Sequence, residues 1–469
     1  MNKTITSADR FVFYGFLVLF LWLPLPLGSN RSWAIGLMEV WVFLLSISWL
    51  ILFFRGHVRF NSTFLTAVFP LIFFILFLVW VLFQSTPLPA DLVALLSPES
   101  FSTYQNSYQT IGIKLNSIPL SLSSYNTYDK FLETLSYFLI FCLMLLLLKN
   151  TRRIRLFAGV IVLSGVFQAV YGSVMTLSGL EYSFFFEKEA YRDVATGTFV
   201  NRNHLAGYLE MCLAIGIGLL ISSLHESNAV SWREFFQRLI HSILGTKIRL
   251  RIGLALMVIA LVLSHSRMGN TAFFSSLTIM GIVYLLLVKK PPRSIIILFV
   301  SLLLIDVFIV GAWFGIDKVA QRLENTSASH ETRDEVVRDT LTMIKDYPFT
   351  GTGGGTYDIS FLRYRGHDIS GFYNHAHNDY AEFLAEYGLI GVSFLFLLVM
   401  SSLMSALLAL RKRKHILLKG MAFASSMGIF AILIHSTVDF NLQIPANASL
   451  FIALLVLGHI SLHFKSRNG

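Results

Sequence analysis

Twelve apolar runs, each of a length suited to crossing a bilayer, limit what this chain can fold into more than any other feature. They fall near residues 11–27, 33–54, 63–83, 131–149, 156–178, 203–224, 251–265, 270–288, 294–314, 389–409, 420–438 and 447–463. Roughly 20 helical residues cross about 30 Å of hydrocarbon, and a helix satisfies its own backbone hydrogen bonds there. The hydrophobic share of 55% also exceeds the roughly 50% usual for soluble proteins. We therefore expect an all-α polytopic membrane protein with about 12 transmembrane helices, in which residues 1–469 form a single integral membrane domain.

The distribution of charge predicts the orientation of these spans. Lys and Arg accumulate in cytoplasmic loops. If both termini are cytoplasmic, that side holds most of the 37 basic residues but only Asp9, Glu226 and Glu234 among the 27 acidic ones. The net charge of +10 then reflects membrane topology. It gives no reason to expect nucleic-acid binding.

The first apolar run is expected to remain as a span, because it contains Pro24 and Pro26 and lacks the small-residue exit of a cleavable signal. Cys142 and Cys212 both lie within apolar runs. Neither a disulfide framework nor a thiolate metal site is therefore predicted.

Three outward segments are of interest, and two of them, 179–202 and 315–388, carry nearly all the outward charge. Residues 84–130 are rich in Ser, Tyr, Thr, Asn and Pro, which suits either a sugar-binding surface or an ordinary ordered loop. Residues 315–388 are too long for a structureless loop in a compact protein. Apolar spacing over 333–347, and a second helical pattern over 377–388, predict that this large periplasmic loop forms a small helical cap.

Four groups of residues resemble, in the same order, the motifs of the O-antigen ligase and polymerase superfamily, membrane enzymes that move lipid-linked glycans outside the cytoplasm. The matching residues are Phe199, Asn201, Asn203 and Ala206; Ser264, Ser266, Arg267 and Gly269; Arg333, Met343, Ile344, Lys345, Asp346, Pro348, Gly351 and Gly353; and His377, Asn378, Gly388 and Gly391. One departure is Val337, where the family often has Trp.

The resemblance implies a GT-C-like glycosyltransferase acting from the periplasmic face of a bacterial inner membrane. The donor would be a lipid-linked oligosaccharide on undecaprenyl pyrophosphate, and the acceptor a glycan or lipid A core hydroxyl. His377 would be the general base, because histidine titrates near the working pH. Arg267 and Arg333 would hold the departing pyrophosphate through their planar, permanently charged guanidinium groups.

Further residues are expected to contact substrate, and each also has a structural reading. They are Asn201, Arg202, Asn203, Arg338, His375 and Asn378. His375 rivals His377 as the base, since spacing alone does not choose between them. Asn201 or Asn203 can instead cap a helix, and Arg338 can face solvent. Gly351 to Gly355 suit a turn that closes the cap better than a phosphate loop.

No metal or cofactor is predicted. The chain contains no Asp-x-Asp pair, and His375 and His377 have no convincing third ligand. Five ionisable residues within or beside the spans have no assigned role: Glu39, Glu210, Asp306, His435 and Asp439.

Two alternatives remain open. A polymerase would use the same residues to join repeat units, possibly with a chain-length regulator as partner. A flippase or other transporter would instead place its ionisable groups near the bilayer midplane, often in repeated halves.

Overall fold

The computed structural model describes residues 8–110, 112, 114–223, 246–289, 291–297, 299–301, 333–369 and 371–465. Within these ranges, nine helices are long and apolar enough to cross a membrane. They are α2 (Ser32–Phe54), α4 (Val68–Ser85), α7 (Ser124–Leu147), α8 (Thr151–Ser178), α9 (Arg202–Ser223), α12 (Arg267–Leu287), α17 (Asp379–Lys412), α18 (Ile416–His435) and α19 (Pro445–His463). The prediction of an all-helical polytopic membrane protein is confirmed for this part of the chain.

The other three predicted spans are not among these nine helices. Helix α1 (Arg10–Trp22) is apolar but shorter than the run near 11–27. Helix α11 (Thr246–Leu263) carries Lys247, Arg249 and Arg251 in its first two turns. The span predicted at 294–314, including Asp306, lies largely outside the described residues. The number of twelve spans therefore stays a prediction.

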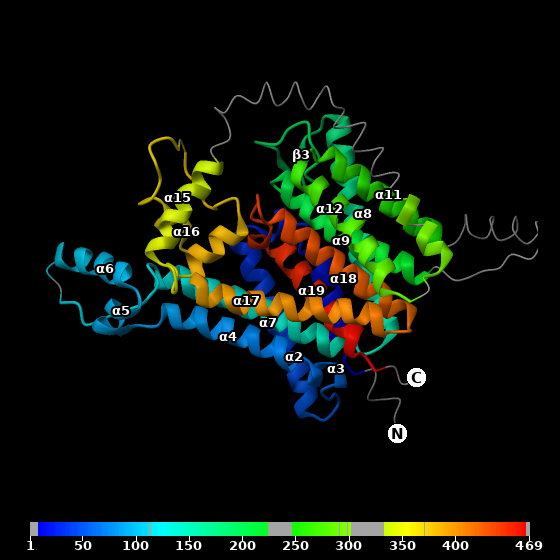
Figure 1. The fold of residues 1–469 in the computed structure, drawn as a ribbon, viewed down its shortest axis with the longest axis horizontal. Coiled ribbons are helices and arrows are strands. Elements are labelled where there is room, and N and C mark those ends of the chain that lie inside the picture. The colour runs from blue at the N-terminus through cyan, green and yellow to red at the C-terminus, as the bar shows by residue number, and fades with distance from the viewer. Residues whose placement is uncertain are drawn as a thin grey trace, which may run out of the picture.

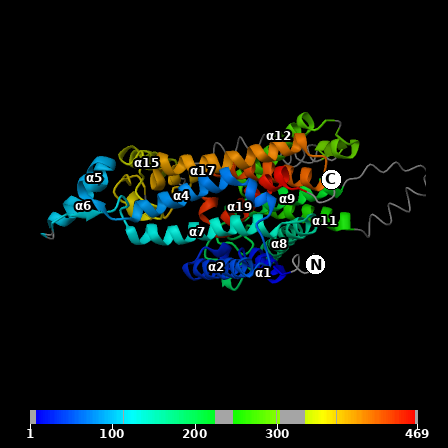
Figure 2. The same cartoon turned by 90° about the horizontal axis from the view of Figure 1, so that it is seen from below.

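Helices α9, α18 and α19 form the buried centre of the bundle, whereas α2, α4 and α17 expose much of their apolar surface. Small residues allow the central helices to approach closely. A Cβ on Gly218 of α9 would collide with the backbone oxygen of Gly420 on α18, and the converse also holds. Around this centre, α4 packs against both α7 and α17, as Figures 1 and 2 show.

Helix boundaries differ from the hydropathy pattern where polar residues continue a helix. The run at 63–83 divides into α3 (Ser62–Thr66) and α4. The predicted helix 377–388 and the run 389–409 join into α17, interrupted only at Gly388 (φ 62°, ψ −177°). Helical hydrogen bonding continues past the hydrophobic boundary, so hydropathy alone misplaces these ends.

One end of the bundle carries a small cap, which we define as residues 333–378. It contains α15 (Arg333–Asp346), which confirms the predicted helix, and α16 (Tyr357–Phe361). Residues 84–130 lie at the same end and form a hairpin of β1 (Leu88–Pro89) with β2 (Ser117–Ile118), together with α5 (Ala90–Leu96) and α6 (Pro98–Thr110) (Figure 1). This segment braces the cap, since Glu99 pairs with Arg363 at 2.5 Å.

The glycine turn at 351–355 fixes the cap to the break in α17. A Cβ on Gly388 would overlap the carbonyl oxygen of Phe349, so only glycine fits this crossing. The backbone N–H groups of Thr352 and Gly353 donate to the carbonyls of Ala385 and Glu386, both at 2.9 Å. The carbonyls freed at the break are thereby satisfied. Two of the turn's amides are already used in this way, which supports the reading of 351–355 as a turn.

Candidate active site

Three histidine rings surround Phe440 where the loop before α17 meets the chain between α18 and α19. Ring centroids lie 4.2 Å from Phe440 for His375, 4.9 Å for His377 and 4.7 Å for His204. His375 stacks on the phenyl face, while the other two rings lie perpendicular to it. Phe440 is only 8% exposed. Residues far apart in sequence thus converge on one buried ring.

His375 is paired with a buried carboxylate. Its Nδ1 lies 2.7 Å from Oε1 of Glu382, which is 1% exposed, and the other carboxylate oxygen accepts from the Ala376 N–H at 2.8 Å. Burial by itself would lower the pKa of His375. The charge and hydrogen bond of Glu382 outweigh burial and raise that pKa. His375 therefore holds a proton more readily than an ordinary histidine.

His377 has the opposite character. Burial, followed by the positive charge of Arg333, lowers the pKa of His377 to about 4. Its backbone adopts a left-handed conformation (φ 52°), and its Nδ1 is buried without a hydrogen-bond partner among the described residues. Such strain is uncommon outside glycine and often marks functional sites. The expectation that His377 titrates near the working pH is therefore wrong, because burial and Arg333 keep the ring neutral there. A neutral ring can still accept a proton.

Two further histidines of the same region, His435 and His204, each lie close to a buried carboxylate. His435 Nδ1 of α18 lies 2.8 Å from Glu210 Oε1 of α9, and both side chains are fully buried. His204 Nε2 lies 3.8 Å from Asp439 Oδ1. Burying such groups within a membrane protein is costly, and they mark functional sites by default. The structure thus places three of the unassigned residues, Glu210, His435 and Asp439, in one cluster.

The Arg267 motif packs against α9 beside that cluster. Ser266 accepts the Gly269 N–H at 3.1 Å and caps α12, while a Cβ on Gly269 would meet Ala206 and Glu210. The Ser266 and Gly269 positions of this motif therefore have a structural explanation, because Ser266 is a helix cap and Gly269 allows close approach. Arg267 itself is exposed, and no carboxylate within the described ranges pairs with it.

The α9 motif combines a cap with a cation. Asn201 accepts the Asn203 N–H at 2.9 Å, so the capping interpretation applies to Asn201. Asn203 is half-buried. The Arg202 guanidinium lies over the Tyr191 ring at 5.8 Å, and its buried Nε has no hydrogen-bond partner among the described residues. Binding of an anion by Arg202 stays a prediction.

The cap supplies the third cation. Arg333 is the first residue of α15, half-buried, and close enough to affect His377 electrostatically. Arg338 instead is 56% exposed and pairs with Asp339 and Asp368, each at 2.9 Å. Asn378 caps α17 by accepting the Ala381 N–H at 3.1 Å. Of Arg333, Arg338 and Asn378, Arg333 is the one whose charge lowers the pKa of His377.

Several residues of this cluster were not predicted from the sequence. They are His204, Asp379, Glu382, Phe440, Asn441 and Asn447. Asp379 accepts from Ser436 Oγ at 2.7 Å, and Asn447 donates to the His204 carbonyl at 3.0 Å. The sequence offered one signal for these residues, namely polar side chains at the ends of apolar runs. That signal does not predict which of these side chains contact one another in the fold. Glu39 of α2 lies near Glu133 of α7.

No three His, Cys, Asp or Glu side chains within the described ranges are arranged to hold a metal ion. Metal independence remains a prediction, since it concerns the reaction and not only these side chains.

A known protein family matches part of the chain. Residues 252–396 match the family model described as O-antigen ligase. The matched segment contains Arg267, Arg333, His375 and His377, and it leaves out the α9 motif and Phe440. No curated protein matches the chain.

Proposed function

We propose that this protein transfers a glycan from undecaprenyl pyrophosphate to an acceptor hydroxyl. The match of residues 252–396 to the O-antigen ligase family model supports this proposal. The observation that carries this proposal is the pair of neighbouring histidines with opposite pKa shifts, His375 raised and His377 lowered. Environments that push two titratable groups apart are typical of sites that divide acid and base roles. Arginines at the same end of the bundle suit an anionic leaving group.

In the proposed reaction, neutral His377 takes the proton of the acceptor hydroxyl as that oxygen bonds to the anomeric carbon. The bond from that carbon to the pyrophosphate oxygen breaks at the same time, with inversion. Pyrophosphate leaves with an added negative charge, which Arg267 and Arg333 stabilise and Arg202 supports. His375, held in place by Glu382, has a positioning role beside His377 and does not itself take the proton.

The acceptor distinguishes two versions of this function. A ligase would use lipid A core or a similar terminal acceptor, while a polymerase would use a second lipid-linked repeat unit. We place the reaction on the periplasmic face of the inner membrane, with cytoplasmic termini, because basic residues concentrate on the side opposite the cap. A flippase would move the donor without forming a glycosidic bond.

The test compares His377→Ala with His375→Ala in purified protein supplied with lipid-linked donor and acceptor. His377→Ala should reduce transfer by about 10²–10⁴-fold, the usual range for a general base. Donor binding should remain, since the base acts on the acceptor. His375→Ala should be milder because its proposed role is orientation.

An active His377→Ala beside an inactive His375→Ala would reverse the two roles. Two active variants would reject a histidine base altogether. Transport of donor by the unmodified protein without any new glycosidic bond would reject the transferase proposal.

A further inference from the structure

Two turns at the end of the bundle opposite the cap carry basic residues. One joins α7 to α8 and is followed by Arg153, and the other joins α17 to α18 and includes Arg413. Figure 1 shows α17 running from the cap to this end, where α18 begins. A buried carboxylate neutralises the first turn, since Asp9 lies 2.9 Å from Lys149 and 2.7 Å from Arg153.

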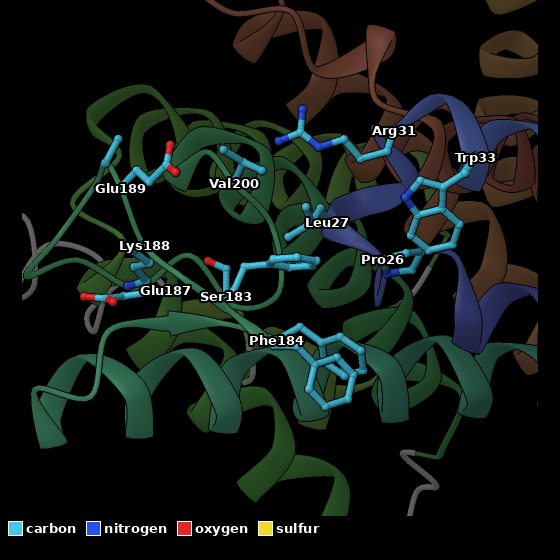
Figure 3. Close-up of a pocket in the computed structure, with 13 residues that line it drawn as sticks. Pro26, Leu27, Arg31, Trp33, Ser183, Phe184, Glu187, Lys188, Glu189 and Val200 are labelled. Atoms are coloured by element: carbon cyan, nitrogen blue, oxygen red, sulfur yellow. The ribbon is translucent and has the colours of Figure 1, made fainter.

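Cations at the cap end are also accompanied by carboxylates. Figure 3 shows Arg31 and Lys188 beside a cavity, which the chain between α1 and α2 and the hairpin of β3 (Tyr182–Ser183) with β4 (Phe186–Glu187) enclose. Glu187 lines the same cavity, and Lys188 pairs with Glu181 at 2.7 Å. Pairing of this kind offsets the cost of withdrawing a charge from water.

Arg413 at the α17–α18 turn is different. Its guanidinium is half-buried and donates to the carbonyl of Leu462 near the end of α19. Burial alone lowers the pKa of Arg413, whereas a carboxylate nearby would raise it. Among the residues that the structure describes, no Asp or Glu therefore neutralises this charge.

Three further basic side chains lie near Arg413. His463, half-buried in the last turn of α19, is close enough to Arg413 for their charges to interact. Lys414 follows Arg413 directly, Lys465 lies two residues beyond His463, and both are exposed. We call Arg413, Lys414, His463 and Lys465 the basic site. Within the described ranges, none of the four forms a salt bridge.

General rules of membrane topology explain only part of this arrangement. Lys and Arg collect at cytoplasmic helix ends, and cations stabilise helix C-termini through the helix dipole. These rules account for Arg411 and Lys412, which are exposed in the last turn of α17. They do not account for Arg413, because a half-buried charge is costly unless a counter-charge pairs with it. A negative group from outside the chain would remove that cost.

The position of the basic site favours a lipid as the source of this group. Helices α17, α18 and α19 are apolar enough to span a membrane, so their ends lie where lipid headgroups do. Apolar side chains are exposed close by, since Ile416 at the start of α18 is 41% exposed and Met404 of α17 is 50% exposed. Basic pockets between transmembrane helices suit anionic headgroups.

We propose that the basic site binds the phosphate of an anionic phospholipid, whose acyl chains lie against α17 and α18. Arg413 donates to a phosphate oxygen, and the two lysines add positive charge at the rim. The lipid thereby joins the ends of α17 and α19 and stabilises the folded protein by binding it. The proposal goes beyond glycan transfer and does not depend on it.

Native mass spectrometry of the full chain tests the proposal, with cardiolipin as the anionic probe and phosphatidylethanolamine as the zwitterionic one. Cardiolipin should bind, and phosphatidylethanolamine should bind much more weakly. Arg413→Gln should weaken cardiolipin binding by roughly 10–100-fold, the loss of a charge-assisted hydrogen bond. Lys414 is exposed, so Lys414→Gln should leave the fold intact and weaken binding about fivefold.

Arg152→Gln is the matched control, because Arg152 is exposed in the first turn of α8 beside the turn that Asp9 neutralises. It removes an equal charge and should leave cardiolipin binding nearly unchanged. If Arg152→Gln weakens binding as much as Lys414→Gln, the general charge of this end attracts the lipid and the proposal is wrong. Unchanged binding in both Arg413→Gln and Lys414→Gln would also overturn it, as would equal binding of phosphatidylethanolamine.

Competition with inorganic phosphate separates a lipid from a free ion. Cardiolipin should stay bound in excess phosphate because its acyl chains contribute, and its displacement would indicate a free-anion site and overturn the lipid assignment. Cardiolipin should also raise the thermal unfolding midpoint of the unmodified protein in nanodiscs more than that of Lys414→Gln; equal midpoints would contradict the proposal. None of these measurements uses a glycan donor or acceptor, so their failure is distinct from failure of the proposed function.

Discussion

Replacing Arg333 by Gln should move the acid limb of the pH–rate profile to higher pH. His377 must be neutral to accept a proton, so activity falls as pH drops through its pKa. That pKa is lowered to about 4, first by burial and then by Arg333. Asp439 and Glu382 act in the opposite direction, and His375 adds to the lowering. Removing the Arg333 charge therefore raises the pKa of His377.

The structure limits how far the pKa of His377 can rise in the variant. The upper limit is the ordinary histidine pKa of about 6.5. Burial, the larger cause, remains in the variant, so only part of the difference is recovered. We expect a shift of roughly one pH unit, equivalent to about 1.4 kcal/mol between the two protonation states. The acid limb should move from near pH 4 to roughly pH 5.

The assay measures kcat/KM for glycan transfer between pH 3.5 and 8 in nanodiscs. Arg365→Gln is the matched control, because Arg365 is an exposed cap arginine that donates to the Gly371 carbonyl at 2.8 Å. Its removal changes net charge equally and should leave the acid limb in place. Activity must also return after transfer to pH 7, which excludes unfolding as the cause. An acid limb near pH 6.5 in the unmodified protein, or an unchanged limb in Arg333→Gln, would refute the reasoning.

Four further predictions test other parts of the structure. Arg267→Lys should reduce transfer by roughly 10–100-fold at normal abundance, since an ammonium cannot replace two guanidinium hydrogen bonds; near-parental turnover would make Arg267 a membrane anchor. Transfer should continue in EDTA, and rescue of lost activity by magnesium or manganese would contradict the metal-free scheme. Gly388→Ala should lower thermal stability by more than about 1 kcal/mol, because its φ is positive and its Cβ would meet Phe349, whereas Gly159→Ala on α8, with open space around it, should be neutral or stabilising. In a cysteine-free background, membrane-impermeant maleimide should label His367→Cys but not Lys412→Cys in intact cells, and the reverse pattern would invert the topology.

The sequence by itself determined the class of fold and much of the membrane map. Runs of about 20 apolar residues have few alternatives to a spanning helix, because backbone polar groups must be satisfied within the segment. The existence of helix α15 was equally predictable, but its buried face was only partly so. The apolar spacing predicted a face of Val336, Val337, Thr340, Leu341 and Ile344, whereas the structure buries Val336, Asp339, Thr340 and Met343 and leaves Leu341 50% exposed. The motifs also predicted His377, Arg267 and Arg333 as site residues; each lies in a described part of the structure, and their roles stay predictions.

Only the tertiary structure decided how those residues meet. The choice between His375 and His377 depends on Glu382 and Arg333, which impose opposite pKa shifts through space and have no fixed spacing in the sequence. Phe440 looked like an ordinary residue of an apolar chain, and Glu210 was an ionisable residue without an assigned role. Packing placed Phe440 among three histidines and Glu210 beside His435. Periodicity reports which face of a helix is buried, but it carries no information about which other helix covers that face. Contacts between distant segments, and the electrostatics that follow from them, therefore required the folded protein.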